Sequence, residues 1–377
     1  MNKCILIAAD IHTHPIIAGN QQCIMQYVET LRTLGFDIYF LYIDLYEGNF
    51  INDETRNYWG DHFFYFKTSI YQTILQKIRR RIEHCYYSPH LDAYYPWGLT
   101  KYVNKLHEIY NFNGLIVNYI WNSKLANCTI PIKAIFTHDV FTNRNEKLGQ
   151  KDAWYSYSKN EEARGIARFE NVLSIQDVES NWYREIAPHC NVRTVYSSFT
   201  FVKQPICNNK NILFFSGGGK LNKDGIDKFI REVWPIILSK DDDVKLLIGG
   251  GICSCYKQEE LTRGIVLMGK YANPSDFYKN GNICINPVFN GSGLKIKTFE
   301  ALAHGKALIV NPHSALGVYS PNNIPLYRAS TPQQYVDNIF RYLDNEILLI
   351  EQRNACEQYI NKLNNYILRQ YKEVFNI

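Results

Sequence analysis

The order of short apolar segments constrains the fold of this chain more than any other feature. Residues 4–10, CILIAAD, form an apolar run that a glycine-containing loop follows. In residues 21–37, apolar side chains recur at helical spacing up to Gly35, a residue typical of helix ends. Residues 37–43, DIYFLYI, form a second apolar run. The sequence therefore predicts a β-α-β unit, and such units build parallel sheets with right-handed crossovers.

The same alternation starts again in the second half of the chain. A polar, proline-containing stretch at 197–210 separates the two halves, and the next predicted strand is NILFFS at 211–216. The 377 residues are too many for one ordinary hydrophobic core. We therefore expect an α/β fold with two Rossmann-like domains, residues 1–200 and 208–352, with a helical segment at 353–377 that packs back on the first domain. The other predicted strands are 114–120, 133–140, 171–177, 244–251, 264–270, 282–288 and 306–311.

Composition narrows the class of protein further. Hydrophobic residues make up 46% of the chain, but the apolar runs are strand-sized and fall short of the roughly 20 residues that a membrane span needs. Asp10 interrupts the first apolar run, unlike the core of a secretory signal, so we expect a cytoplasmic protein. The net charge of +5 is mild and no RNA-recognition motif occurs, which argues against nucleic acid as a partner. The cysteines lack zinc-site spacing, and we expect no metal.

A basic stretch at 67–84, KTSIYQTILQKIRRRIEH, sets five lysines and arginines against one glutamate. It is compatible with a solvated helix face. It is also compatible with a surface that faces an anionic membrane or phosphate groups. The aromatic stretch at 86–97 has similar alternatives: contact with an acceptor glycan, contact with a membrane interface, or core packing.

The segment NPVFNGSGLKIKTFEALAHGKALIV at 286–310 predicts an anion site at a helix start. A helix that begins near Leu294 places Lys297, Glu300 and His304 on one face. Its first amide groups, the two glycines before it and a lysine suit a diphosphate, and Glu300 suits the hydroxyl groups of a ribose. A tight turn with solvated lysines is the alternative.

Longer motifs extend this pattern. FFSGGGKLNKDGIDKFIREVWPIIL, VKLLIGGG and the stretch from GIVLMGK to HSALGV resemble the carboxyl lobe of family 4 glycosyltransferases of the GT-B fold, over residues 211–318. In the amino half, AGNQQCIMQYVETLRTLGFDIYFLY at 18–42 and AIFTHDVFTNR at 134–144 are similar to that family's first loop and helix and to its strand with a His-Asp pair.

The resemblance implies two facing Rossmann-like domains with a cleft between them. It also implies transfer of a sugar from a UDP- or GDP-sugar to a glycan acceptor, with retention of configuration and without metal. The expected acceptor is a lipid-linked surface-polysaccharide intermediate, so the enzyme would be cytoplasmic or peripheral on the inner face of the cytoplasmic membrane.

Position by position, the resemblance assigns site residues. Glu300 would hold the ribose, and His138, Lys297 and Lys220 would be catalytic, with Lys223 the alternative cation to Lys220. Asp139 and Arg144 would lie on the acceptor side. The other donor-binding positions are Gly19, Gly217, Gly218, Asn290, Gly291, Ser292, Gly293 and Leu294.

Two alternatives to transfer follow from the same residues. Many members of the family carry a glutamate eight residues before the position of Glu300, where this chain has Ser292. A GT-B protein that has lost catalysis and binds or regulates a partner is therefore one alternative, and a nucleotide-sugar epimerase is another. Asp10, His12 and His14 follow the first strand, where an inverting enzyme would place its base, but such side chains are also common in ordinary loops.

Overall fold

The computed structural model describes residues 3–45, 52–68, 70–86, 91–148, 155–291, 295–321, 323–343 and 345–377. The chain divides into two compact units. The first contains Met1–Ser198 and Tyr366–Ile377, and the second contains Phe199–Asn365.

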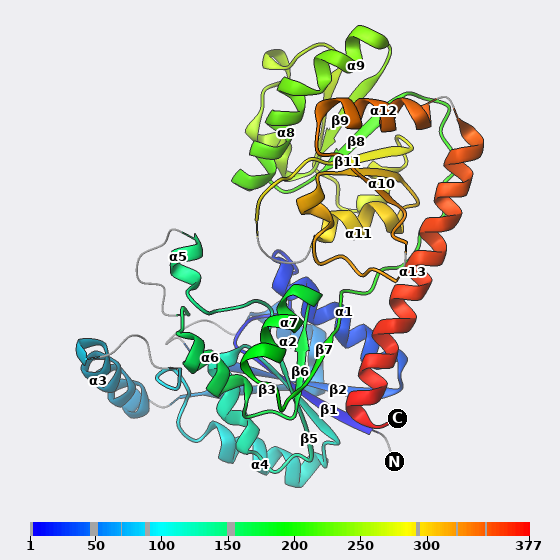
Figure 1. Ribbon diagram of the computed structural model, residues 1–377. Coiled ribbons are helices and arrows are strands. Elements are labelled where there is room, and N and C mark those ends of the chain that lie inside the picture. The colour runs from blue at the N-terminus through cyan, green and yellow to red at the C-terminus, as the bar shows by residue number, and fades with distance from the viewer. Residues whose placement is uncertain are drawn as a thin grey trace. The chain divides into compact units, whose positions relative to one another are not determined.

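The first unit is built on a seven-stranded parallel sheet in the order β3-β2-β1-β4-β5-β6-β7, with helices packed against it (Figure 1). Its central strands are apolar and buried along their length, as expected for parallel strands that are covered on both faces. The strands are β1 (Lys3–Ala9), β2 (Phe36–Asp44), β3 (Phe63–Lys67), β4 (Gly114–Asn118), β5 (Ile132–Phe136), β6 (Asn171–Ser174) and β7 (Asn191–Thr194). The helices are α1 (Gly19–Thr33), α2 (Asp53–Trp59), α3 (Ile70–Tyr86), α4 (Leu99–Tyr110), α5 (Arg144–Leu148), α6 (Lys159–Ile166) and α7 (Asp177–Ile186), with 3₁₀ turns η1 (Gly60–His62) and η2 (Ile120–Asn127).

The second unit repeats this plan with a six-stranded parallel sheet in the order β10-β9-β8-β11-β12-β13. The strands are β8 (Asn211–Phe215), β9 (Lys245–Gly249), β10 (Ile265–Gly269), β11 (Ile283–Asn286), β12 (Ala307–Val310) and β13 (Leu326–Arg328). The helices are α8 (Lys220–Glu232), α9 (Trp234–Lys240), α10 (Pro274–Tyr278), α11 (Ile296–Ala303) and α12 (Pro332–Leu343), with 3₁₀ turns η3 (Gly251–Cys255), η4 (Gln258–Glu260) and η5 (Pro312–Ala315).

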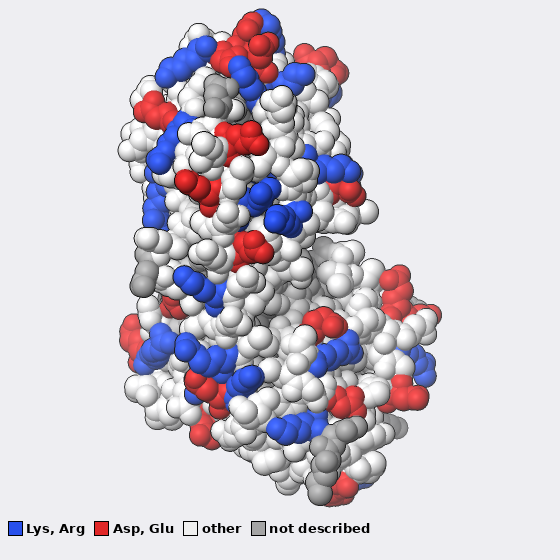
Figure 2. Space-filling model, turned by 90° about the vertical axis from the view of Figure 1, so that its right-hand side faces the viewer, with Lys and Arg blue, Asp and Glu red and all other residues white. Residues whose placement is uncertain are grey.

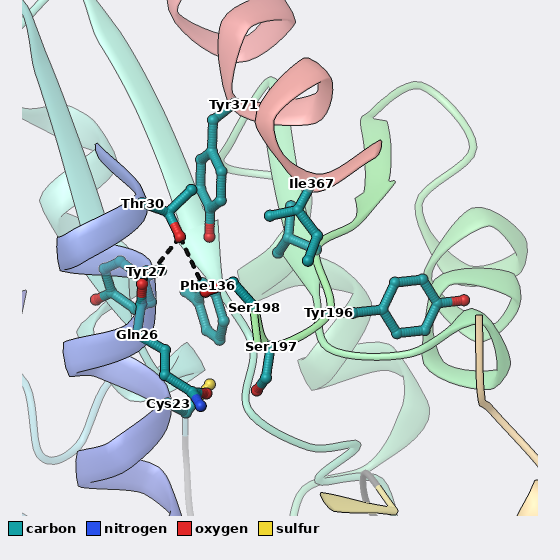
Figure 3. Close-up of a pocket in the computed structure, with 11 residues that line it drawn as sticks. Cys23, Gln26, Tyr27, Thr30, Phe136, Tyr196, Ser197, Ser198, Ile367 and Tyr371 are labelled. Atoms are coloured by element: carbon teal, nitrogen blue, oxygen red, sulfur yellow. Dashed lines mark hydrogen bonds between the residues drawn. The ribbon is translucent and has the colours of Figure 1, made fainter. Parts of the chain in front are cut away.

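The long helix α13 (Glu346–Phe375) starts in the second unit and ends in the first. Its last turns belong to the core of the first unit, where Phe375 lies 5.3 Å from Phe36 between ring centroids. Gly114 makes room for this contact, because a Cβ at that position would lie 2.5 Å from the Phe375 ring. Figure 3 shows Tyr371 of α13 beside Thr30 of α1, in a small pocket that both helices line.

The predicted α/β class with two Rossmann-like domains is confirmed by the two parallel sheets. Every strand predicted from an apolar run is present. The helical segment after β8 is divided into α8 and α9, and both halves contribute apolar side chains such as Ile226 and Ile237 to the core. Pro235 stands at the start of α9, where a missing N–H is tolerated.

Candidate functional site

Each sheet has one point at which the strand order changes direction, between β1 and β4 and between β8 and β11. Ligands of open α/β sheets bind beyond the carboxyl ends of the strands at such a point. In the second unit, β8 leads to the glycines at 217–219 and β11 leads to the predicted anion loop, so the two loops follow neighbouring strands.

Lys297 is the partly buried cation of this site. Its Nζ donates a hydrogen bond to Oδ1 of Asn222 in α8, and Nδ2 of Asn222 donates to the carbonyl oxygen of Gly217 at 3.0 Å. Burial and, to a smaller extent, the neighbouring Lys295 lower the pKa of Lys297 to about 8, against the opposing effect of Glu300. Asn222 therefore connects the two loops. The ammonium form of Lys297 is less stable here than it is in water, because burial disfavours the charged form.

Glu300 lies one turn further along α11. Burial raises its pKa to about 7, while Lys297 acts in the opposite direction. Among the residues that the structure describes, no donor forms a hydrogen bond to its carboxylate. A carboxylate whose oxygens accept no hydrogen bond from the described residues suits a pair of ribose hydroxyl groups as donors.

The contacts of Lys220 and Lys223 differ, which bears on which of the two is the cation at the glycine loop. Lys223 forms an ion pair with Asp227 at 2.6 Å and lies 4.9 Å from the centroid of the Tyr256 ring. Lys220 is exposed at the first position of α8, after Gly219, and has no ion pair within the described part of the chain. Gly217 and Gly218 are exposed before it, and the amide groups of this helix start carry no side-chain cap.

The loop after β11 is described only in part. Ser292, Gly293 and Leu294 lie outside the described residues, so their predicted roles stay predictions. Asn290 accepts a hydrogen bond from the amide of Gly291 at 2.8 Å.

Gly291 has a positive φ of 122°, which favours glycine, and its carbonyl oxygen accepts from Lys295 at 3.2 Å. His313 contacts the same oxygen at 2.9 Å. His313 was not among the predicted site residues, although it follows β12 and therefore lies at the carboxyl ends of the strands, as the loop after β11 does.

The histidine predicted to share a face with Lys297 and Glu300 has a structural role instead. His304 lies just after the end of α11, where its Nδ1 is 2.7 Å from the carbonyl oxygen of Glu300 and its Nε2 is 2.9 Å from Oγ of Ser275. Its ring stacks on Tyr278 at 4.3 Å. The helix ends one residue too early to keep this side chain on the expected face.

In the first unit, His138 lies two residues after the end of β5. Its Nε2 lies 2.8 Å from Oδ1 of Asn118, whose Nδ2 donates to the carbonyl oxygen of Ala8 at 3.1 Å. Because a carbonyl can only accept, the amide of Asn118 is oriented with its oxygen toward His138, so Nε2 carries the hydrogen and Nδ1 is left as an acceptor. Burial lowers the pKa of His138 to about 3, which keeps the ring neutral.

The backbone at His138 has a φ of +62°, a conformation that residues other than glycine rarely adopt. Its ring stacks on Tyr119 at 4.4 Å, and the Tyr119 hydroxyl accepts from Nδ2 of Asn20, the residue after Gly19. The start of α1 and the end of β5 therefore meet around one aromatic ring. Left-handed residues of this kind concentrate at functional sites.

The two predicted acceptor-side residues form an ion pair, between the guanidinium of Arg144 and the carboxylate of Asp139. The loop that carries them is held by Glu162, a fully buried carboxylate that the sequence analysis missed. Glu162 accepts from the backbone amides of Phe141 and Thr142 at 2.8 and 3.1 Å. An isolated glutamate in a helix gives no sequence signal for such a role.

Asp10 lies in a polar cluster with Trp121 and Asn122. Its carboxylate accepts from Nε1 of Trp121 and Nδ2 of Asn122, both at 3.1 Å, and burial raises its pKa to about 6. Both donors hold the carboxylate in place, which favours a fixed structural group at this sheet edge.

The described residues contain no helix with the length and apolar character of a membrane span. They also contain no group of three or more His, Cys, Asp or Glu side chains arranged to hold a metal ion.

Comparison of the whole fold identifies its class. A crystal structure of TarM matches with a TM-score of 0.67 at 12% identity, and the match covers 100% of this chain and 99% of the TarM chain. A second TarM structure names S. aureus as the source. Anabaena Alr3699/HepE in complex with UDP matches with a TM-score of 0.65 at 10% identity over 100% of both chains. The lipopolysaccharide outer core galactosyltransferase WaaB matches with a TM-score of 0.56 at 13% identity, over 98% of this chain and 99% of its own. The fold is that of the GT-B proteins.

Sequence comparison adds a family match. Residues 209–345, which lie in the second unit, match the family model described as Glycosyl transferases group 1. The predicted resemblance is confirmed for that unit. An uncharacterized 44.6 kDa protein in the cps region of Klebsiella pneumoniae is 26% identical over 152 residues, which span 37% of this chain and 38% of that protein.

Proposed function

We propose that the protein is a glycosyltransferase that moves a sugar from a nucleoside-diphosphate donor to a glycan acceptor. One observation carries the proposal: Lys297 and Glu300 are partly buried at the strand-order reversal, beside the glycine loop that precedes Lys220, within the region that matches the glycosyl transferases group 1 model. A partly buried cation, and a carboxylate that has no hydrogen-bond donor among the described residues, suit a phosphate and a ribose at neighbouring positions.

We infer that UDP is the nucleotide part of the donor. Alr3699/HepE is described in complexes with UDP and with UDP-glucose, and a TarM structure contains UDP, which favours UDP over GDP. In this proposal Glu300 accepts hydrogen bonds from the ribose. Lys297 and Lys220 bind the diphosphate, and the amides of Ser292 and Gly293 complete the phosphate site.

The proposed chemistry needs stabilisation of charge on the leaving diphosphate. As the bond between the sugar and the phosphate lengthens, negative charge grows on the phosphate oxygens. Lys297 has a pKa near neutrality, so an approaching dianion raises that pKa and draws the amine fully into its ammonium form. The amide groups at the start of α8 and the ammonium of Lys220 add fixed positive potential.

We propose the first unit as the acceptor side. His138 is neutral and offers Nδ1 as an acceptor, which suits the hydroxyl group of an incoming sugar better than a phosphate. The cps-region relative supports a surface polysaccharide as the product, and a lipid-linked intermediate handled with retention is the form of acceptor that we propose. Asp139 and Arg144 form the adjoining ion pair.

Thermal unfolding with nucleotides tests the donor site. We expect UDP to raise the melting temperature more than GDP, ADP, CMP or TDP, because a ligand that binds only the folded state stabilises it. Glu300→Ala should weaken UDP binding by about 1 to 3 kcal/mol through the lost ribose hydrogen bonds. The matched control is Glu259→Ala, an exposed glutamate in η4 of the same unit, which should leave the UDP shift unchanged.

Product analysis then separates transfer from its alternatives. Incubation with UDP-sugars and glycolipid acceptors should give a transferred sugar and free UDP. An isomerised donor without transfer would instead identify an epimerase. UDP binding that depends on Glu300 but gives no product with any donor and acceptor would identify a binding protein of this fold.

A further inference from the structure

Helix α3 presents a stripe of apolar side chains to solvent. Its members recur at spacings of three, four and seven residues, which places them on one face of the helix. Figure 1 shows α3 at the margin of the first unit, set off from the sheet. The stripe consists of Tyr71, Ile74, Leu75, Ile78 and Ile82, whose exposed fractions are 81%, 49%, 48%, 52% and 58%.

On the opposite side of α3, Thr73 is buried, and its hydroxyl lies 3.1 Å from that of Thr68. Position 73 lies about 140° around the helix from position 78, at 100° per residue. The apolar stripe is therefore on the side away from Thr73. It is a contiguous exposed apolar patch rather than a set of scattered single residues, and such patches mark interaction sites.

Positive charges border the stripe. Lys77 and Arg81 are exposed and flank it on one side, since they lie about 100° and 60° from position 78 around the helix. The sequence adds Arg79 and Arg80, and the only acidic residue of α3 is Glu83 near its end. By contrast, basic and acidic side chains are interspersed over the face drawn in Figure 2.

We propose that α3 docks the protein on an anionic lipid bilayer, parallel to its surface. The apolar stripe would enter the boundary between headgroups and acyl chains, and the flanking cations would contact lipid phosphates. A second copy of the chain fits this face less well, because pairing two stripes would bring two rows of cations together.

The inference deepens the proposed function and rests on it in one respect, since a lipid-linked acceptor is found at a bilayer surface. Docking is nevertheless measured without donor or acceptor. Failure of vesicle binding therefore leaves the nucleotide assay untouched, and failure of the nucleotide assay leaves vesicle binding untouched.

Co-sedimentation of the full chain with lipid vesicles tests the proposal. We expect binding to vesicles of phosphatidylcholine mixed with phosphatidylglycerol and little binding to phosphatidylcholine alone. The double substitution Ile74→Ser with Ile78→Ser should weaken binding by about tenfold or more, because each removes apolar area from the lipid contact. The matched control is Ile109→Ser, since Ile109 of α4 is 73% exposed but lies outside the stripe.

The charged border is tested separately. Lys77→Gln with Arg81→Gln should weaken binding to the anionic vesicles, and salt of about 1 M, which shortens the Debye length to about 3 Å, should do the same to the unchanged protein. Lys101→Gln, an exposed lysine of α4, is the control. Circular dichroism and gel filtration of every variant monitor folding and oligomeric state.

Three results would overturn the proposal. Equal binding to neutral and anionic vesicles would exclude the electrostatic part, and equal binding by the stripe variants and the Ile109→Ser control would exclude α3. Absence of vesicle binding, together with a dimer that the stripe substitutions convert to a monomer, would assign the stripe to a contact between copies.

Discussion

Lys297→Met offers the sharpest test of the site, because it should stabilise the protein while damaging its function. A pKa lowered from 10.5 to about 8 means that folding disfavours the ammonium form by about 3 kcal/mol at neutral pH. Loss of the hydrogen bond to Asn222 and of the attraction to Glu300 offsets about 1 kcal/mol. We therefore expect a net gain of about 2 kcal/mol, or about 4 to 8 °C in melting temperature for a unit of this size.

The stability difference between Lys297→Met and the unchanged protein should depend on pH. The folded state releases the Lys297 proton near pH 8, whereas the unfolded chain keeps it to about 10.5. As the pH rises from about 8 to about 10.5, the ammonium form of Lys297 therefore stops lowering the free energy of unfolding. The extra stability of Lys297→Met should disappear over the same pH range.

Melting curves at pH about 7 and about 10, combined with UDP titrations at the lower pH, measure both effects. We expect higher stability at pH 7 only, and UDP affinity reduced about tenfold or more. A variant that is less stable than the unchanged protein at both pH values would show that Lys297 is not held at a disadvantage, and the argument from a prepared anion site would fail.

The other predictions concern single residues elsewhere. Gly250→Ala should lower the free energy of unfolding by about 3 kcal/mol or more in urea, because φ is +94° and an added Cβ would lie 2.5 Å from the carbonyl oxygen of Ser216; Gly217→Ala, with nothing within 4 Å, is its control. Burial raises the pKa of Glu179 to about 8, with Asp139 acting in the same direction, so stability should fall by about 1.4 kcal/mol per pH unit from about 4.5 to 8. Glu179→Gln should remove that slope, and a slope that survives would locate it in another group. His138→Ala should slow transfer about 100-fold and leave UDP affinity nearly unchanged; a large loss of UDP affinity would reject its placement on the acceptor side.

The sequence predicted the fold well because parallel strands are buried on both faces and read as continuous apolar runs. The edge strands β3, β7 and β13 were not predicted: β3 was missed although its aromatic run FFYFK is typical of a strand, whereas β7 and β13 carry weak signals. β7 is four residues long and starts with an exposed asparagine, and β13 has three residues. The residue content of such strands does not distinguish them from loops.

The candidate site was predictable to the extent that it follows strand ends. Lys297 and Glu300 were found because glycines, lysines and a glutamate stand together after one apolar run. Asn118, which orients the ring of His138, was not found, because the contact joins residues 20 positions apart through a buried amide. Contacts of this kind depend on which strands become neighbours, and the order of strands in a sheet leaves no local mark in the sequence.

Helix α13 has a consequence for how the protein is made. Side chains of residues 366–375 complete the core of the first unit, in which Tyr371 and Phe375 are buried, so that unit is not continuous along the chain. During synthesis, residues 1–198 emerge early but lack part of their interior until α13 has left the ribosome. The amino-terminal domain, which usually folds first, is here held back until the end of α13 is available, and the nascent first unit is the part that needs protection from aggregation.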